Sequence, residues 1–283
     1  MLVTSIIWGV AFVAQKEAMN YMGPFTFTGI RFALGGLALI PVVYFFERGR
    51  VTGLSLKTTV GAGACGGAVL FAAASLQQYG VQLTMSAGRS GFITGLYIVL
   101  VPILGVALKK KTNAFTWAGA FLATSGLYFL SAPDGLGSIG RGDIALVSGA
   151  FFWAAHIHLV GHFAERIRPV RFSIAQFLTC SALSMACAFI FEGVSAGAVI
   201  SGYVPILYSA LLSVGIAYTL QIVGQRHVAP AKAAIIFSLE TIFSVLGGAV
   251  LLGETMDPRG YAGCGLIFAG IMASQIAPGK LKW

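Results

Sequence analysis

Charged residues are scarce in this sequence. Of its 283 residues, 18 are Lys or Arg and 9 are Asp or Glu, together 10% of the chain, whereas soluble domains average about 25%. Hydrophobic residues make up 57% of the chain, and its mean hydropathy is +0.87. So few charges do not cover the surface of a water-soluble globule of this size. The composition therefore excludes a soluble protein and indicates a protein embedded in a bilayer.

The sequence also lacks the patterns of a disulfide framework, a metal site, a nucleotide-binding site and a serine nucleophile. The four cysteines each stand inside an apolar run, which excludes a disulfide framework. Among the clustered histidines, His158 and His162 have helical spacing, but no further metal ligands accompany them, so we expect no metal site. No phosphate-binding loop, dinucleotide fingerprint or serine-nucleophile motif occurs in a suitable context. We therefore expect no cofactor and no direct use of ATP.

The excess of basic residues gives a formal net charge of +9. In a soluble protein this charge would suggest a nucleic-acid partner. Here the cations stand in short clusters between apolar segments and form no continuous basic face. We therefore expect no nucleic-acid partner and interpret the cations as signals of membrane topology.

Apolar runs occupy most of the chain, and each is about 20 residues long, the length that crosses a bilayer core. Their bounding charges, prolines and glycine clusters predict ten transmembrane helices, and hence an all-α integral membrane protein. The predicted spans are 2–20, 24–46, 58–83, 87–108, 113–131, 143–161, 170–191, 202–224, 230–252 and 258–277. The connections between them are short, so no loop can hold a soluble domain.

The distribution of Lys and Arg predicts the orientation. With ten spans, both termini lie on the same side, and the loops and termini of that side carry twelve of the Lys and Arg residues. The opposite side has three, Arg89, Arg141 and Arg259. Because loops rich in these residues stay in the cytoplasm, we predict cytoplasmic termini. The protein is expected to be a multi-pass protein of a plasma membrane, such as a bacterial inner membrane.

The two halves of the chain repeat each other at an offset of 143 to 145 residues. Aligned pairs in successive spans include Trp8 with Trp153, Arg31 with Gln176, Gln77 with Gln221, and Tyr97 with Glu240. We predict two five-helix repeats, residues 1–141 and 142–283. Because five is an odd number of spans, the second repeat enters the membrane from the opposite side. Inverted repeats of this kind are a signature of secondary transporters.

The sequence also resembles a known family along nearly its whole length. The residues that carry the resemblance are Trp8-Gly9 with Phe12-Val13 and Lys16, Arg31-Phe32, Ser86-Ala87 leading into Pro102, Leu239-Glu240, and Leu252-Gly253-Glu254 followed by Gly263 and Gly270. They are similar to the EamA family of the drug/metabolite transporter superfamily. This resemblance implies a ten-helix carrier of small metabolites or drugs, commonly an exporter. The family often has proline where this sequence has Thr241, so the proline that would kink the ninth span is absent.

Ionisable residues within the spans are the first candidates for function, because a charge at the bilayer centre costs about 2.5–3.5 kcal/mol on insertion scales. Glu240 lies near the middle of the ninth span. It is a candidate for proton coupling or for binding a substrate amine, and the alternative is a structural hydrogen bond between helices. Arg31 lies in the second span. It either pairs with Glu17 or binds a substrate carboxylate, which suits its planar guanidinium.

Polar and aromatic side chains recur at helical spacing on one face of several spans. From these faces we expect a substrate cavity lined by Trp8, Gln77, Tyr97, Trp153, His156 and Gln221. Such a lining suits a small amphipathic or zwitterionic solute better than a bare ion. The alternative is that some of these side chains serve only as hydrogen bonds between helices.

Together these features predict a secondary active transporter that exports small amphipathic metabolites, such as amino acids or drugs, by alternating access of the two repeats. The expected partners are the small-molecule substrate, the lipid bilayer and, if transport is proton-coupled, protons; the oligomeric state stays open. The alternative is a membrane channel or a membrane-embedded enzyme. Against these, the sequence shows neither a filter loop nor a cluster of catalytic residues.

Overall fold

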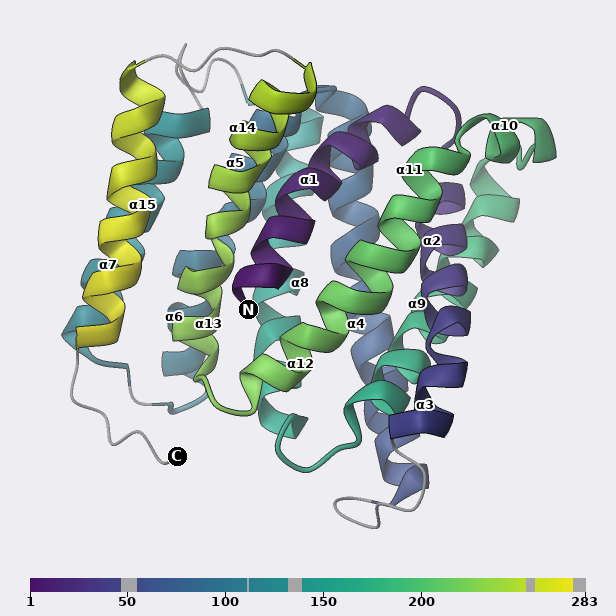
Figure 1. The fold of residues 1–283 in the computed structure, drawn as a ribbon, viewed down its shortest axis with the longest axis horizontal. Coiled ribbons are helices and arrows are strands. Elements are labelled where there is room, and N and C mark those ends of the chain that lie inside the picture. Colours follow the sequence, from purple (N-terminus) through teal and green to yellow (C-terminus); the bar gives the residue numbers. More distant parts are fainter. Residues whose placement is uncertain (47–54, 111, 132–138, 253–257, 277–283) are drawn as a thin grey trace.

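The computed structural model describes residues 1–46, 55–110, 112–131, 139–252 and 258–276. Within these ranges every regular element is a helix, and no strand occurs. The helices stand side by side in one bundle, with α7 and α15 together at one edge (Figure 1). Gly253 and Glu254, which contribute to the family resemblance, lie outside the described residues.

The helices of residues 1–131 follow the apolar runs of the sequence. They are α1 (Leu2–Ala18), α2 (Pro24–Ala38), α3 (Ile40–Phe46), α4 (Leu56–Thr84), α5 (Ala87–Gly95), α6 (Tyr97–Ala107) and α7 (Ala114–Ser131). Sequence signals set several of these boundaries. Pro24 opens α2 because proline has no amide hydrogen to leave unpaired in a first turn, and the hydroxyls of Ser55 and Ser86 accept backbone N–H groups at the starts of α4 and α5.

The rest of the described chain is helical in the same way. Its helices are α8 (Arg141–Phe163), α9 (Pro169–Phe191), α10 (Ala196–Ser201), α11 (Tyr203–Leu207), the π-helix η1 (Tyr208–Tyr218), α12 (Thr219–Gln225), α13 (Pro230–Phe237), α14 (Leu239–Leu252) and α15 (Pro258–Ile276). Each predicted span corresponds to one helix or to a run of consecutive helices. The short helix α10, which Ser195 caps, was not predicted.

Six of the described helical segments are long and apolar enough to cross a membrane. They are Pro24–Phe45, Leu56–Thr84, Arg89–Ala107, Arg141–Phe163, Pro169–Phe191 and Tyr203–Gln225. The structure is therefore an all-helical protein with several membrane-spanning segments. The crossing of the remaining predicted spans, and the inverted arrangement of the two repeats, stay predictions.

Two of the predicted spans are interrupted near their middle, within one residue of aligned positions. The fourth span breaks between α5 and α6 at Leu96, and the ninth breaks between α13 and α14 at Ser238. The ninth span thus breaks without the family's proline after Glu240. At this break the Ser238 hydroxyl donates a hydrogen bond to the carbonyl of Ile235, 2.6 Å away. Such a bond draws the backbone away from regular helix and replaces part of its pairing.

Helices of the two predicted repeats pack directly against one another. Helix α1 packs on α14, α2 on α9, and α4 on both α8 and α9. Glycines allow the closest approaches. A Cβ atom added at Gly9 would lie 2.6 Å from the carbonyl oxygen of Glu240, and one added at Gly126 would lie 2.5 Å from that of Gly263. The division at residues 141 and 142 stays a prediction, and many contacts cross it.

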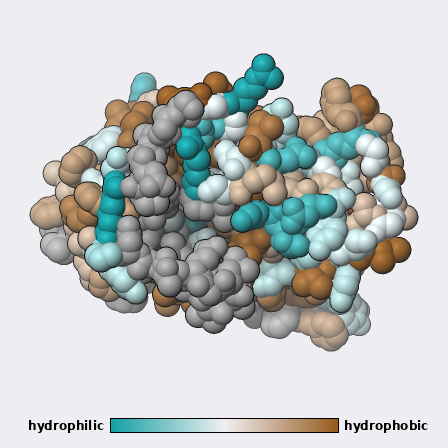
Figure 2. Space-filling view, turned by 90° about the horizontal axis from the view of Figure 1, so that it is seen from above, coloured by the Kyte–Doolittle hydropathy of each residue, from teal (hydrophilic) through white to brown (hydrophobic). Residues whose placement is uncertain are grey.

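The sides of the bundle expose large apolar side chains, as a lipid-facing surface would. Phe45 is 76% exposed, Phe121 is 73% exposed and Phe191 is 72% exposed. At the end of the bundle that is uppermost in Figure 1, hydrophilic side chains lie among apolar ones (Figure 2). Inside the bundle, several of the buried polar side chains line one cavity.

Candidate functional site

A small cavity lies inside the bundle, at the interrupted middle of the fourth and ninth spans. Its volume is about 40 Å³, which is room for two or three water molecules. Seven of the eight predicted site residues line it: Trp8, Arg31, Gln77, Tyr97, Trp153, Gln221 and Glu240. The lining also includes Gln15, Thr94, Ser213, Tyr218 and Phe237. Residues from both halves of the chain therefore enclose a single space.

His156, the eighth predicted residue, lies behind this lining. Its side chain is fully buried, and its Nε2 lies 3.0 Å from the amide oxygen of Gln176. Its ring packs edge-on against Trp153 and Tyr218, with centroids 6.0 and 6.4 Å away. His156 thus contacts two rings of the cavity wall without being part of the wall itself.

Glu240 and Tyr97 face each other across the cavity region. The Tyr97 hydroxyl donates a hydrogen bond to Oε1 of Glu240 over 3.0 Å, and both side chains are buried. In the part of the chain that the structure describes, no cation pairs with Glu240. The contact connects α6 to α14 at the first turn of each helix. A carboxyl group placed here has one phenol as its partner and the cavity beside it.

Arg31 extends from α2 into the cavity wall and is only 3% exposed. Its guanidinium carbon lies 4.9 Å from the ring centroid of Phe27 and 5.2 Å from that of Phe32. No carboxylate pairs with it among the described residues, and its Nε has no hydrogen-bond partner there. The charge is therefore held by aromatic faces and is available to an anion.

The predicted ion pair between Arg31 and Glu17 does not form. Glu17 is exposed and accepts hydrogen bonds from the Asn20 amide at 3.1 Å and from the Tyr21 hydroxyl at 3.0 Å. These partners lie three and four residues further along the chain, so local contacts satisfy the carboxylate at the helix end. The binding of a substrate carboxylate by Arg31 stays a prediction.

A chain of amide side chains forms one wall of the cavity. The Trp153 indole donates to Oε1 of Gln77 at 2.7 Å, and Nε2 of Gln77 donates to Oε1 of Gln15 at 3.3 Å. Near the aligned position in the second half, Nε2 of Gln221 donates to Oε1 of Gln225 at 2.9 Å. The Oε1 of Gln221 is buried and, within the described residues, accepts no hydrogen bond. It is a free acceptor at the cavity wall.

Tyr218 is the centre of the aromatic lining. Its ring lies 4.8 Å from the centroid of Trp8, and 6.0 Å from that of Trp153 in a nearly parallel orientation. The Trp8 indole donates to the carbonyl of Ser213, 3.3 Å away in the π-helix η1. The cavity residues expected from the sequence include neither Tyr218 nor Ser213, although Tyr218 shares a helical face with Gln221, three residues further along the chain. No sequence pattern predicts the π-helix η1, which sets the orientation of the Ser213 and Tyr218 side chains.

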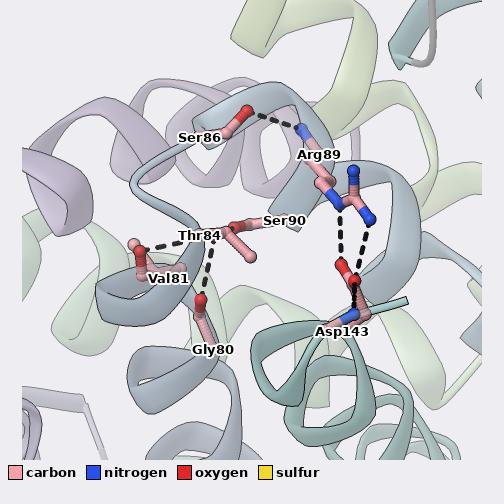
Figure 3. Close-up of polar contacts among 8 residues, drawn as sticks. Gly80, Val81, Thr84, Ser86, Arg89, Ser90 and Asp143 are labelled. Atoms are coloured by element: carbon pink, nitrogen blue, oxygen red, sulfur yellow. Dashed lines mark hydrogen bonds and ion pairs between the residues drawn. The ribbon is translucent and has the colours of Figure 1, made fainter. Parts of the chain in front are cut away.

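An ion pair connects α5 and α8, two helices that carry cavity residues. Asp143, in the first turn of α8, accepts hydrogen bonds from Nε of Arg89 at 2.7 Å and from Nη2 at 2.8 Å (Figure 3). The backbone N–H of Gly140 also donates to Asp143. Beside this pair, the hydroxyls of Thr84 and Ser90 lie 2.9 Å apart. The ion pair joins α5 to α8, and the contact between the hydroxyls joins α4 to α5.

Several known proteins are similar to this chain over most of its length. An uncharacterized transporter of Archaeoglobus fulgidus is 28% identical, with 96% of this chain and 83% of the relative covered. The uncharacterized transporter YwfM of Bacillus subtilis is 24% identical, with 100% and 94% covered. The uncharacterized inner membrane transporter YedA of Escherichia coli is 21% identical, with 94% and 86% covered.

One solved crystal structure shares the fold, with a TM-score of 0.76 at 19% identity over 96% of this chain and 94% of that chain. A model of the EamA-like transporter family matches residues 1–132 and 140–274. The match covers both halves of the chain and includes every residue of the cavity lining. The protein therefore belongs to the EamA-like transporter family and is a multi-pass membrane transporter.

Proposed function

We propose that this protein is a secondary active transporter that exports small amphipathic metabolites, such as amino acids or drugs, by alternating access of two inverted five-helix repeats. The observation that carries the proposal is the buried cavity, which combines an unpaired arginine, a carboxyl group and a set of aromatic rings. A soluble ligand would exchange a hydration shell for these groups. In a purely structural core, an unpaired buried charge would only lower the stability of the fold.

The lining supports a substrate with a carboxylate and an apolar part. Arg31 offers the substrate carboxylate a planar donor group, and Trp8, Trp153 and Tyr218 offer it flat apolar surfaces. A substrate amine would be placed at Glu240, or at the free Oε1 of Gln221. A site for a carboxylate and a site for an amine, with apolar surfaces between them, favour an amphipathic or zwitterionic solute such as an amino acid.

Alternating access is supported by the state of the cavity. Its volume of about 40 Å³ is far below the 300–1,000 Å³ of typical ligand sites, so a substrate enters only when helices move apart. On one side of the cavity α5 contacts α14, and on the other α6 contacts α13. The breaks at Leu96 and Ser238 lie between these contacts and provide hinges at which either pair can separate alone.

We place the coupling of transport to protons at Glu240. When it binds a proton, the carboxyl group becomes neutral and can remain in the closed cavity with Tyr97. When it loses the proton, it becomes an anion that attracts a substrate amine. Competition between a proton and a substrate at one carboxyl group would make each drive the release of the other. The cytoplasmic position of both termini and the outward direction of net flux belong to this proposal.

Reconstituted protein tests the proposal. In proteoliposomes loaded with a binding amino acid, a carrier should accelerate uptake of the labelled amino acid, and uptake should saturate with substrate concentration. A channel would show no acceleration by substrate on the far side, and an enzyme would change the substrate chemically. Substrates are first found by thermal unfolding of the purified protein with amino acids, amines, nucleosides and cationic dyes, because a ligand that binds only the folded state raises its midpoint.

A further inference from the structure

A second hollow opens on the side of the bundle between the C-terminal parts of α6 and α8. Its wall includes Leu104, Leu108, Phe151 and Ala155, and its polar end is formed by Lys110 and His158. We call it the α6–α8 groove. Its volume is about 560 Å³, and it shares no lining residue with the central cavity. It therefore belongs to a different site.

The position of Lys110 at the groove is fixed by His158. Nε2 of His158 lies 2.7 Å from the carbonyl oxygen of Val101. A carbonyl oxygen can only accept, so Nε2 carries the hydrogen and Nδ1 is an acceptor. The Lys110 ammonium group lies 3.4 Å from Nδ1 and donates to it. An ammonium group has three N–H donors, so two remain for another acceptor, and no carboxylate in the described chain forms an ion pair with Lys110.

Apart from His162, the remainder of the groove lining is apolar, and it faces outward. Leu108, which directly follows α6, is 57% exposed, and Phe151 of α8 is 47% exposed. Both helices belong to segments long and apolar enough to cross a membrane. The polar end lies where α6 and α8 finish, in the turn that carries Lys109 and Lys110. This order, an apolar wall within the membrane followed by an ammonium group at its surface, matches the order of an acyl chain and a phosphate in a phospholipid.

We propose that the α6–α8 groove binds an anionic membrane lipid, with the headgroup phosphate on Lys110 and an acyl chain along Leu104, Leu108 and Phe151. Charge complementarity selects the anionic class. A zwitterionic lipid carries its own cation beside the phosphate, which weakens its attraction to Lys110, whereas phosphatidylglycerol does not. Basic pockets between transmembrane helices bind anionic headgroups in this manner. The proposal does not depend on what the central cavity transports.

Thermal unfolding of the full-length protein in neutral detergent tests the site, with increasing phosphatidylglycerol, phosphatidylcholine or inorganic phosphate. Phosphatidylglycerol should raise the midpoint most, and inorganic phosphate should leave it unchanged because it cannot use the apolar wall. Lys110→Ala should require about fivefold more phosphatidylglycerol for the same shift, since one such cation contributes that factor. Lys110→Arg should keep the wild-type response.

Lys109→Asn is the matched control. It removes one positive charge from the same turn, outside the groove lining, and asparagine tolerates the positive φ of 56° at this position. It should respond to phosphatidylglycerol as the wild type does. Ala155→Leu fills the groove and should lower the response without lowering the midpoint in detergent alone. Equal responses of the Lys110→Ala and Lys109→Asn variants, or equal effects of the two lipids on the wild type, would overturn the proposal.

Discussion

Replacing Arg31 with glutamine separates a binding role from a structural one. The substitution removes the charge from the cavity wall and introduces the residue found at the aligned position, Gln176. A hydrogen bond to a charged group contributes about 1.5–3 kcal/mol, and about 1.4 kcal/mol is a factor of ten. The dissociation constant of a carboxylate substrate should therefore rise about ten- to hundredfold.

The same change should not destabilise the fold. In the described residues Arg31 has no counter-ion, so its burial is opposed by a desolvation penalty of several kcal/mol. Its contacts with Phe27 and Phe32 return about 0.5–2 kcal/mol each. Glutamine lowers the penalty and loses these contacts. We expect Arg31→Gln to unfold at a temperature no lower than the wild type, which a structural salt bridge would not allow.

The assay compares one amino acid that binds the wild type with its methyl ester. The ester lacks the carboxylate, so Arg31→Gln should weaken binding of the acid and leave binding of the ester nearly unchanged. Arg31→Lys retains the charge without the planar donor group and should give an intermediate affinity for the acid. If Arg31→Gln bound the acid as tightly as the wild type, or weakened acid and ester equally, the reasoning about this charge would be wrong.

Three other substitutions test the remaining parts of the structure. Glu240→Gln should abolish the effect of a pH gradient on uptake while counterflow persists, because the amide cannot exchange a proton; undiminished gradient dependence would contradict the coupling role. Gly9→Ala should lower the thermal midpoint, at a cost of about 1–3 kcal/mol, because the added Cβ meets backbone of α14. Gly61→Ala, where nothing lies within 4 Å, is its control and should not lower it. Arg89→Ala should lower stability by about 1–3 kcal/mol, because Asp143 is only 8% exposed and loses both hydrogen bonds from the guanidinium. It should also speed counterflow if the pair with Asp143 holds one end closed.

The helical segments could be predicted because the bilayer limits what an apolar run can form. A run of 20 apolar residues in lipid must pair its backbone within itself, so the length of each run fixes the helix, and prolines and serines mark where it starts. The pattern of polar residues also identified seven members of the cavity lining. Polar side chains avoid lipid, so those that recur on one helical face turn towards the interior.

Other features depended on contacts that no local pattern records. Phe237 looks like any aromatic residue of a lipid-facing helix, and only packing places it at the cavity. Ser238 breaks its helix through a hydrogen bond to the preceding turn, where a proline would have been the visible signal. Glu17 was expected to reach Arg31, but hydrogen bonds to Asn20 and Tyr21 hold it at the helix end.

The two predicted repeats carry different residues at aligned positions, so the cavity between them is chemically asymmetric. Arg31 corresponds to Gln176, which contacts His156 behind the cavity wall, so one copy of this position presents a charge and the other fills the interior. Tyr97 corresponds to Glu240, and the two are joined by a single hydrogen bond in which one donates and the other accepts. Symmetric residues at these positions would offer a dipolar substrate two equivalent orientations. With one cation and one carboxyl group, the cavity would hold the proposed zwitterionic substrate in a single orientation.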